Sequence, residues 1–185
     1  MERRNPHDRR RPRPLTGEPV SLDLLNTRWM RDGELQDLLT SVAGLRIWLA
    51  ANGLAGRFTA DAATLEHTLT AREALASLVD GGGADAAARV DAVLGRGRIR
   101  ATLTAAGPGE EAEFADPAWG PAWTAARGHL DLLRTAPDRI RACAHESCVL
   151  HFFDTSRNGT RRWCSMAVCG NRAKASRHWA RGREA

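Results

Sequence analysis

Apolar residues recur at spacings of three and four through most of the first 95 positions, which is the pattern of an α-helix with one buried face. Leucines at these intervals lead to Trp29 and predict a first helix over residues 21–29. Gly33 interrupts the pattern, which then resumes and runs to Asn52-Gly53, a pair typical of a helix end. The opening part of the chain is therefore expected to be helical.

Two further helices are expected in the following segment. Thr59 or Asp61 can cap the N-terminus of the first helix, and the glycines at 81–83 end it. The second, shorter helix is expected over 84–94.

The pattern then changes to alternation over 98–105, where every second residue is apolar, as in a strand with one covered face. Gly-Pro-Gly at 107–109 can turn the chain, and 110–114 can return as the partner strand. A helix that begins at a proline follows and ends at Pro137. Residues 15–137 are therefore predicted to form a mostly helical α+β domain with one β-hairpin.

All four cysteines of the chain lie in its last quarter, with the spacing C-x4-C-x15-C-x4-C. They are Cys143, Cys148, Cys164 and Cys169. Two close pairs separated by a segment of hairpin length are typical of one tetrahedral Zn²⁺ site. Four thiolates leave no position for an activated water, so the predicted zinc ion is structural and not catalytic.

Two disulfides are the alternative interpretation of the same cysteines, and disulfides belong to oxidising compartments. Residues 1–14 are charged and rich in proline, and they lack the apolar core of an export signal. The sequence also has no run of about 18 apolar residues that would span a membrane. The expectation is therefore one zinc ion in a cytoplasmic protein.

The residues around the cysteines predict a small zinc module over 138–183. A strand-like segment at 139–143 leads into the first cysteine pair, VLHFFD follows as a second strand, and Asn158-Gly159 is a hairpin dipeptide. RRWC continues the hairpin. Ser165 then stands where a helix N-cap is expected, between Cys164 and Cys169. Knuckle, hairpin and helix in this order predict a treble-clef-like module.

Formal charge is divided sharply along the chain. Residues 139–185 hold ten basic and three acidic side chains, whereas 15–138 hold eleven basic and 17 acidic ones. A basic tail at 1–14 is expected to be disordered, either simply solvated or as an arm that embraces DNA. Such asymmetry indicates a polyanionic partner, although part of the C-terminal charge compensates the four thiolates of a zinc centre.

The basic residues of the zinc module fall into two sets, and both are candidates for contacts to nucleic-acid phosphates. The hairpin set is Arg157, Arg161 and Arg162, and the helix set is Lys174, Arg177 and Arg181. The alternative is a solvated surface that only offsets the zinc thiolates. Asn171 has two interpretations as well: it reads an adenine base, or it bonds a thiolate or the backbone beside Cys169.

Cys169-Gly170-Asn171-Arg172 spells the motif CGNR, and the surrounding segment resembles the CGNR zinc-finger family along its whole length. Upstream, LDLLNTRW, LRIWLAANGL and REAL resemble the ABATE-type domain that precedes such fingers, so that the resemblance covers residues 18–183. It implies that the four cysteines are zinc ligands and that the protein is a stress-induced transcription regulator.

These observations predict a zinc-binding transcription regulator whose partner is DNA. Its helical domain is expected to sense a small-molecule effector or to form a homodimer. A protein-interaction or RNA-interaction module is the alternative, because zinc knuckles and basic surfaces serve both. The sequence contains no Ser-His-Asp set, phosphate loop or outstanding carboxylate pair, so we expect no enzyme activity. A redox switch at the cysteines is compatible with a stress response.

Overall fold

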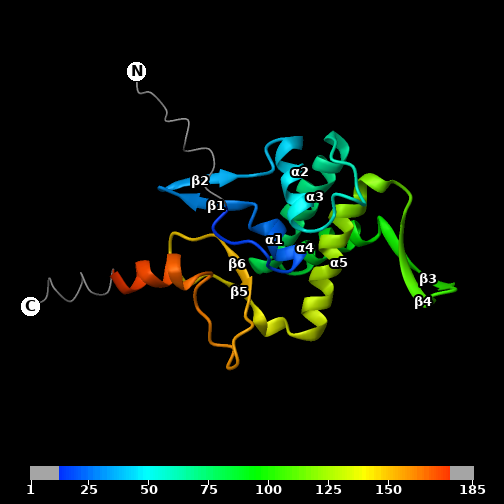
Figure 1. Ribbon diagram of the computed structural model, residues 1–185. Helices are drawn as coiled ribbons and strands as arrows, with labels where there is room; N and C mark the ends of the chain where they lie inside the picture. Colours follow the sequence, from blue (N-terminus) through cyan, green and yellow to red (C-terminus); the bar gives the residue numbers. More distant parts are fainter. Residues whose placement is uncertain (1–12, 176–185) are drawn as a thin grey trace, which may run out of the picture.

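The computed structural model describes residues 13–175, which form a mixed fold of helices and small sheets (Figure 1). The labelled α-helices are α1 (Val20–Leu25), α2 (Val42–Ala51), α3 (Ala62–Val79), α4 (Gly83–Leu94) and α5 (Gly120–Thr135), and residues 171–175 are helical as well. Shorter helical turns are η2 (Pro117–Trp119), η3 (Pro137–Arg139) and the π-helical turn η4 (Met166–Gly170). The strands are β1 (Arg28–Arg31), β2 (Glu34–Asp37), β3 (Gly97–Thr104), β4 (Gly107–Phe114), β5 (Ile140–Ala142) and β6 (His151–Phe153).

The strands pair in three separate antiparallel hairpins, β1–β2, β3–β4 and β5–β6. The α+β class predicted from the sequence is confirmed, and most helical residues precede the cysteines in the chain. The basic tail predicted over 1–14 lies almost wholly outside the described residues. Within the described part of the chain, no helix is both long and apolar enough to cross a membrane.

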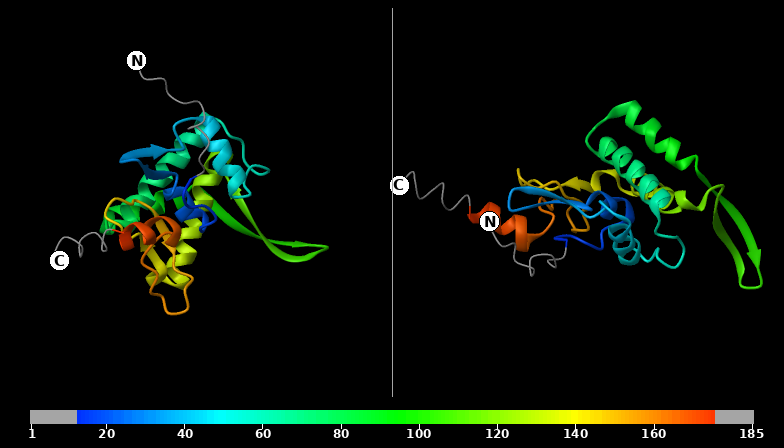
Figure 2. Two further views of the ribbon diagram at one scale, coloured as in Figure 1. Left: turned by 60° about the vertical axis from the view of Figure 1, so that its left-hand side comes forward. Right: turned by 90° about the horizontal axis from the view of Figure 1, so that it is seen from above.

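The core of the helical domain surrounds α1, which packs against α3 and α5 (Figures 1 and 2). A helix of six residues is not stable alone in water, so burial must hold it in place. Leu22 and Leu24 have no exposed surface, and Trp48 of α2 and Leu75 of α3 are equally buried beside them. Trp48 is therefore a core residue.

The helix ends follow the sequence signals closely. Asp61 is the N-cap of α3, and its side chain accepts a hydrogen bond of 2.8 Å from the Thr64 amide. Gly53 and Gly81 follow the C-caps of α2 and α3 with φ of 69° and 84°, a conformation that a side chain disfavours. Glycine is thus required at both positions where a helix stops.

The helix predicted over 21–29 extends too far, and the helical pattern predicted to resume after Gly33 does not begin there. Helix α1 ends at Leu25, and residues 28–37 form the hairpin β1–β2. Asp32 and Gly33 connect the two strands, and both have positive φ (51° and 83°), as a two-residue type I′ turn requires. The Asp-Gly turn signal therefore decides the local structure against the helical spacing of Leu35 and its neighbours.

The second hairpin, β3–β4, projects from the body of the domain as a two-stranded ribbon (Figure 2). Its turn lies at Ala105 and Ala106, and Gly107 begins the return strand with φ of 111°. The predicted hairpin is present, but the predicted turn at 107–109 lies inside β4. Leu103 remains 83% exposed near the tip, because neither face of the ribbon packs on a core there.

Candidate metal centre and its basic surface

The four cysteine sulfurs lie together, within 4.8 Å of one another. The Sγ atoms of Cys148 and Cys164 are 3.8 Å apart, and those of Cys164 and Cys169 are 3.6 Å apart. An ion held tetrahedrally at about 2.3 Å from each sulfur places the sulfurs about 3.8 Å apart. These separations exclude disulfides, and all four thiols are free. The geometry fits one structural zinc ion.

Two local structures supply the two pairs of ligands. Strands β5 and β6 pair around the first knuckle, where the Cys143 amide donates to the Leu150 carbonyl at 2.9 Å. In the second pair, Cys164 lies just before η4 and Cys169 lies on it. The wide turn of η4 is closed by a 3.0 Å bond from the Gly170 amide to the Ser165 carbonyl. A β-carbon at Gly170 would lie 2.7 Å from the Met166 sulfur, so a larger residue there would have to displace the end of this exposed side chain.

The electrostatics of the cysteine cluster favour a bound cation. A hydrogen bond from Cys164 lowers the pKa of Cys148 to about 5. The same contact raises the pKa of Cys164, and burial raises that of Cys169 to about 12. Without a metal, the cluster therefore resists holding four negative charges. A Zn²⁺ ion would be held by Cys143, Cys148, Cys164 and Cys169 as thiolates, and it would supply the charge that makes this state stable.

The loop between the knuckles differs from the predicted hairpin. No strand is assigned to the RRWC segment; instead its Arg162 carbonyl accepts a 2.8 Å bond from the Ala144 amide. Asp154, which is buried, accepts hydrogen bonds from the amides of Ser156 (2.9 Å) and Arg161 (3.0 Å). Ser165 is the N-cap of η4, as predicted from the sequence, although its side chain makes no capping hydrogen bond. A buried carboxylate, and not strand pairing, therefore orders this loop.

The zinc module is attached to the helical domain by a buried asparagine. The Asn26 amide nitrogen donates to the His151 carbonyl at 2.8 Å, and its oxygen accepts from the His151 amide at 2.9 Å. Glu18 adds a 2.8 Å bond from the Phe153 amide. Trp29 of β1 packs into the apolar cluster that contains three of the cysteines. Sequence reasoning missed Asn26. The only sign of its role in the sequence is that an amide side chain stands in the largely apolar run LDLLNT.

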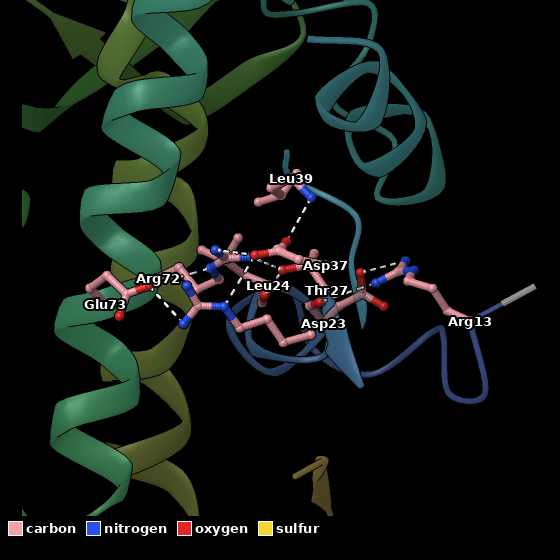
Figure 3. Close-up of polar contacts among 9 residues, drawn as sticks. Arg13, Asp23, Leu24, Thr27, Asp37, Leu39, Arg72 and Glu73 are labelled. Carbon is pink, nitrogen blue, oxygen red and sulfur yellow. Dashed lines mark hydrogen bonds and ion pairs between the residues drawn. The ribbon is translucent and has the colours of Figure 1, made fainter. Parts of the chain in front are cut away.

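A second polar network ties α3 to β2 (Figure 3). Arg72 donates to both carboxylate oxygens of Asp37, at 2.7 and 2.8 Å, and to the Thr27 hydroxyl at 2.9 Å. Burial alone would raise the pKa of Asp37, but the hydrogen bonds from Arg72 and from the Leu39 amide hold it below its ordinary value. Arg72 is only 2% exposed, so this ion pair belongs to the interior of the protein.

The three upstream segments that resemble an ABATE domain meet through such contacts. Asp23, from LDLLNTRW, accepts hydrogen bonds of 3.0 Å from Asn52, from LRIWLAANGL, and from Arg13. Thr27 and Arg72 connect the first segment to REAL (Figure 3). The polar residues of these segments therefore form structural contacts between elements that lie far apart in the sequence.

Arg161 of the hairpin set is engaged inside the zinc module. Its guanidinium donates to the Trp163 carbonyl at 2.9 Å and to the Cys164 carbonyl, and it lies 4.2 Å from the centre of the Phe152 ring. Its nearest carboxylate oxygen is that of Glu18, at 3.8 Å. These contacts hold the backbone that presents Cys164.

The other described basic candidates point outward. Arg157, Arg162 and Lys174 are exposed, and none of the three forms an ion pair within residues 13–175. Arg162 stacks over the Trp163 ring at 5.2 Å. Arg177 and Arg181 lie outside the described residues. Asn171 donates to the Ala167 carbonyl at 3.3 Å, which agrees with the backbone role considered for it.

Comparison with known families agrees with this arrangement. Residues 139–182 match the model of the CGNR zinc finger, and residues 18–136 match the model of the ABATE family, whose description is "putative stress-induced transcription regulator". A comparison with curated proteins gave no match. The first of these models covers the cysteine cluster, and the second covers the helical domain that carries the finger. The chain therefore belongs to the ABATE family and carries a CGNR zinc finger after its ABATE domain.

Proposed function

We propose that the chain is a zinc-dependent, DNA-binding transcription regulator whose CGNR finger contacts the phosphate backbone. The proposal is supported by the family description and by one structural observation. Arg157, Arg162 and Lys174 present exposed cationic groups without a carboxylate partner among the described residues. Such groups are available to phosphate, and guanidinium binds phosphate through two parallel hydrogen bonds.

Three arginines of the ABATE domain provide a contrast, whereas Arg46 and Arg134 of the same domain are exposed and form no ion pair among the described residues. Arg98, Arg100 and Arg127 are also on the surface, but each pairs with a carboxylate of its own domain. A phosphate would have to displace those carboxylates. Residues 139–185 hold ten basic and three acidic side chains, whereas 15–138 hold eleven basic and 17 acidic ones, so the finger is the better candidate for nucleic acid. The proposal requires a location with access to DNA, the cytoplasm of a bacterial-type cell.

The proposed contact surface consists of the exposed finger residues together with two that lie beyond the described part. They are Arg157, Arg162, Lys174, Arg177 and Arg181. We assign Arg161 a supporting role, because its guanidinium already bonds two carbonyls next to Cys164. Arg172 is an addition to the sequence-based set: it is exposed and lies in the helical segment 171–175 that follows Cys169.

Fluorescence anisotropy with zinc-loaded full-length protein tests the proposal. We expect Arg162→Glu with Lys174→Glu to weaken binding to a duplex by about ten-fold or more, because reversal of each charge removes a phosphate contact and adds repulsion. Arg46→Glu with Arg134→Glu is the matched control, since both residues are exposed on the ABATE domain and the change in net charge is the same. An equal loss in both variants would show that only net charge matters.

Salt dependence and competition separate the proposal from its alternative. Each phosphate contact lowers the slope of log K against log salt by about 0.9, so the finger variant should show a shallower slope than the control. Intact zinc with no duplex binding at low salt would contradict the proposal. Capture of a protein partner that survives nuclease treatment would then support an interaction module, and preferential binding of structured RNA would support an RNA-binding one.

A further inference from the structure

The β3–β4 ribbon is anchored to the ABATE domain at its base. Phe114, at the end of β4, makes edge-to-face contacts with Phe58 and with Trp123 of α5, at ring-centroid distances of 5.9 and 5.5 Å. Beyond this base the ribbon extends away from the helices (Figures 1 and 2), and residues 98–111 are mostly exposed. A lone two-stranded hairpin is marginally stable in water, and additional strands stabilise it.

The two faces of the ribbon differ in chemistry. One face carries ion pairs that join the strands, Arg98–Glu113 and Arg100–Glu111. Because side chains alternate along a strand, the opposite face of β3 carries Ile99, Ala101 and Leu103. Ile99 is 41% exposed and Leu103 is 83% exposed, although both are large apolar side chains. Apolar residues that line up on one exposed surface indicate an interaction site.

The free edges of the two strands are not equivalent. Pro108 of β4 has no N–H to donate, and Glu110, Glu111 and Glu113 follow it in the same strand. A second β4 beside this edge would bring like charges together. Strand β3 contains no proline and no carboxylate, and its two arginines are already paired with glutamates of β4. The edge of β3 is therefore the one that can accept another strand.

The sequence of β3 is complementary to a second copy of itself. In an antiparallel pair with twofold symmetry, opposite residues share a face of the sheet, so the axis passes through one residue position. An axis at Ala101 uses all of 98–104 and gives the opposite pairs Ile99–Leu103, Arg98–Thr104 and Arg100–Thr102, each formed twice. Axes at 98, 99 or 100 would set arginines opposite each other, and axes nearer the turn would pair fewer residues of β3. Charge and apolar contacts therefore favour the axis at Ala101.

We propose that the chain forms a homodimer in which the β3 strands of two copies pair antiparallel about a twofold axis at Ala101. The two ribbons then form one four-stranded sheet in the order β4–β3–β3–β4, and its outer edges are the two β4 strands. Closed symmetry stops the assembly at two chains. The ribbon and the zinc finger lie at opposite ends of the molecule (Figures 1 and 2), so this dimer leaves both fingers uncovered. The dimer does not depend on the proposed DNA binding.

Sedimentation velocity of the zinc-loaded full chain tests the dimer at protein concentrations from about 1 to 100 µM. We expect a concentration-dependent shift from the monomer of 20.2 kDa to a species of twice that mass. A chain that stays monomeric over the whole range would overturn the proposal. Growth beyond the dimer would overturn it as well, because pairing of β3 with the second copy's β4 would leave free edges and continue into a filament.

Charge changes at Thr102 test the register. Within one chain this residue lies opposite Gly109 of β4, so a new side chain meets no other side chain directly across the ribbon. In the proposed dimer it lies opposite the second copy's Arg100. Thr102→Arg should therefore weaken the dimer by about three-fold or more, and Thr102→Glu should strengthen it by a similar factor. The same effect in both variants, or no effect in either, would overturn the register.

Two further variants distinguish pairing of the β3 edges from stacking of the apolar faces. Leu103→Lys removes both contacts with Ile99 across the dimer axis and should weaken the dimer by about ten-fold or more. Ala112→Lys is the matched control, because it adds the same charge to the same face on β4, away from the pairing edge. It should leave the dimer unchanged. Zinc content and thermal unfolding establish that the variants are folded, and an equal loss in both would overturn pairing through the β3 edge.

Discussion

The ABATE domain and the zinc finger reach order by different means. The domain buries a core of leucines and Trp48 around α1, and it adds the internal ion pair between Arg72 and Asp37. The finger has a smaller apolar cluster, formed by Leu150, Phe152 and the cysteines. So small a cluster cannot offset the loss of chain entropy, and a metal ion commonly supplies the remainder.

The finger packs against residues of the ABATE domain, whereas most of the buried residues of the domain core do not contact the finger. Trp29 of β1 completes the finger's apolar cluster, and Asn26 bonds the backbone of β6. The comparison indicates an order of stability: the metal contributes most to the finger, the contact with the domain contributes next, and the domain core persists without either. Each level can be broken separately.

Removal of zinc should have the largest effect. Chelation, or Cys164→Ser, is expected to unfold residues beyond Ile140 while the core around Trp48 stays folded, because structural zinc contributes about 10–16 kcal/mol in zinc-finger peptides. Amide spectra of the ¹⁵N-labelled protein would show collapse of finger resonances with little change in those of α2 and α3. Zinc added back after chelation is the control. Retention of the finger spectrum in the zinc-free protein contradicts this ranking.

The internal ion pair of the domain should come second. Asp37→Asn leaves the charge of Arg72 buried and uncompensated, so we expect a loss of about 3 kcal/mol in the free energy of unfolding. Asp131→Asn breaks the exposed pair with Arg127 and should cost less than about 1 kcal/mol. Urea denaturation of both variants measures the difference. Equal costs would mean that burial does not strengthen the first pair.

The contact between domain and finger should come third. Asn26→Ala leaves the His151 amide and carbonyl without their partner, and about 2 kcal/mol of stability should be lost. Asn158→Ala, at an exposed position of the finger, is the control. Hydrogen exchange at the His151 amide should accelerate in the first variant alone. Unchanged exchange would show that the finger holds its position without Asn26.

Sequence reasoning succeeded where one local signal acts alone. The cysteine spacing predicts the cluster, Asp61 and Gly53 mark helix ends, and the alternation after residue 97 predicts a hairpin. It failed at β1–β2, where a turn signal at Asp32-Gly33 competes with helical spacing. Spacing is a weak prior for short segments, because turn chemistry and pairing between strands override it.

Contacts over long sequence separations were also beyond sequence reasoning. Asn26 bonds a residue 125 positions away, and Arg72 bonds Asp37 35 positions away. A single sequence contains no signal for which distant groups will pair. The internal hydrogen bonds of Arg161 could not be predicted for a related reason, since only the folded loop brings the carbonyls of Trp163 and Cys164 to its guanidinium. A count of basic residues does not distinguish a side chain that bonds other groups of the protein from one that is exposed to solvent.

The pH dependence of the domain should give the smallest effect and the sharpest test of the Asp37 assignment. The pKa of this carboxyl is lower in the folded protein than its ordinary value of 3.8. Its contribution is therefore fully present above the pKa of the unfolded state and is lost as pH falls through the lower pKa of the folded state. Between pH 7 and about 5 the stability difference between wild type and Asp37→Asn should be constant, and below about pH 4 it should shrink.

Urea midpoints at intervals from pH 7 to 3 measure this difference, and the Asp131→Asn variant provides the comparison with an exposed pair. Zinc is released as its cysteines are protonated, so the probe must report on the domain core, for example through amide signals of α3 around Arg72. A difference between wild type and Asp37→Asn that persists undiminished at pH 3 would mean that the asparagine perturbs packing. The loss of stability would then not be caused by the lost charge. In that case the ion pair would not be one of the contacts that keep the ABATE domain folded when the finger is unfolded.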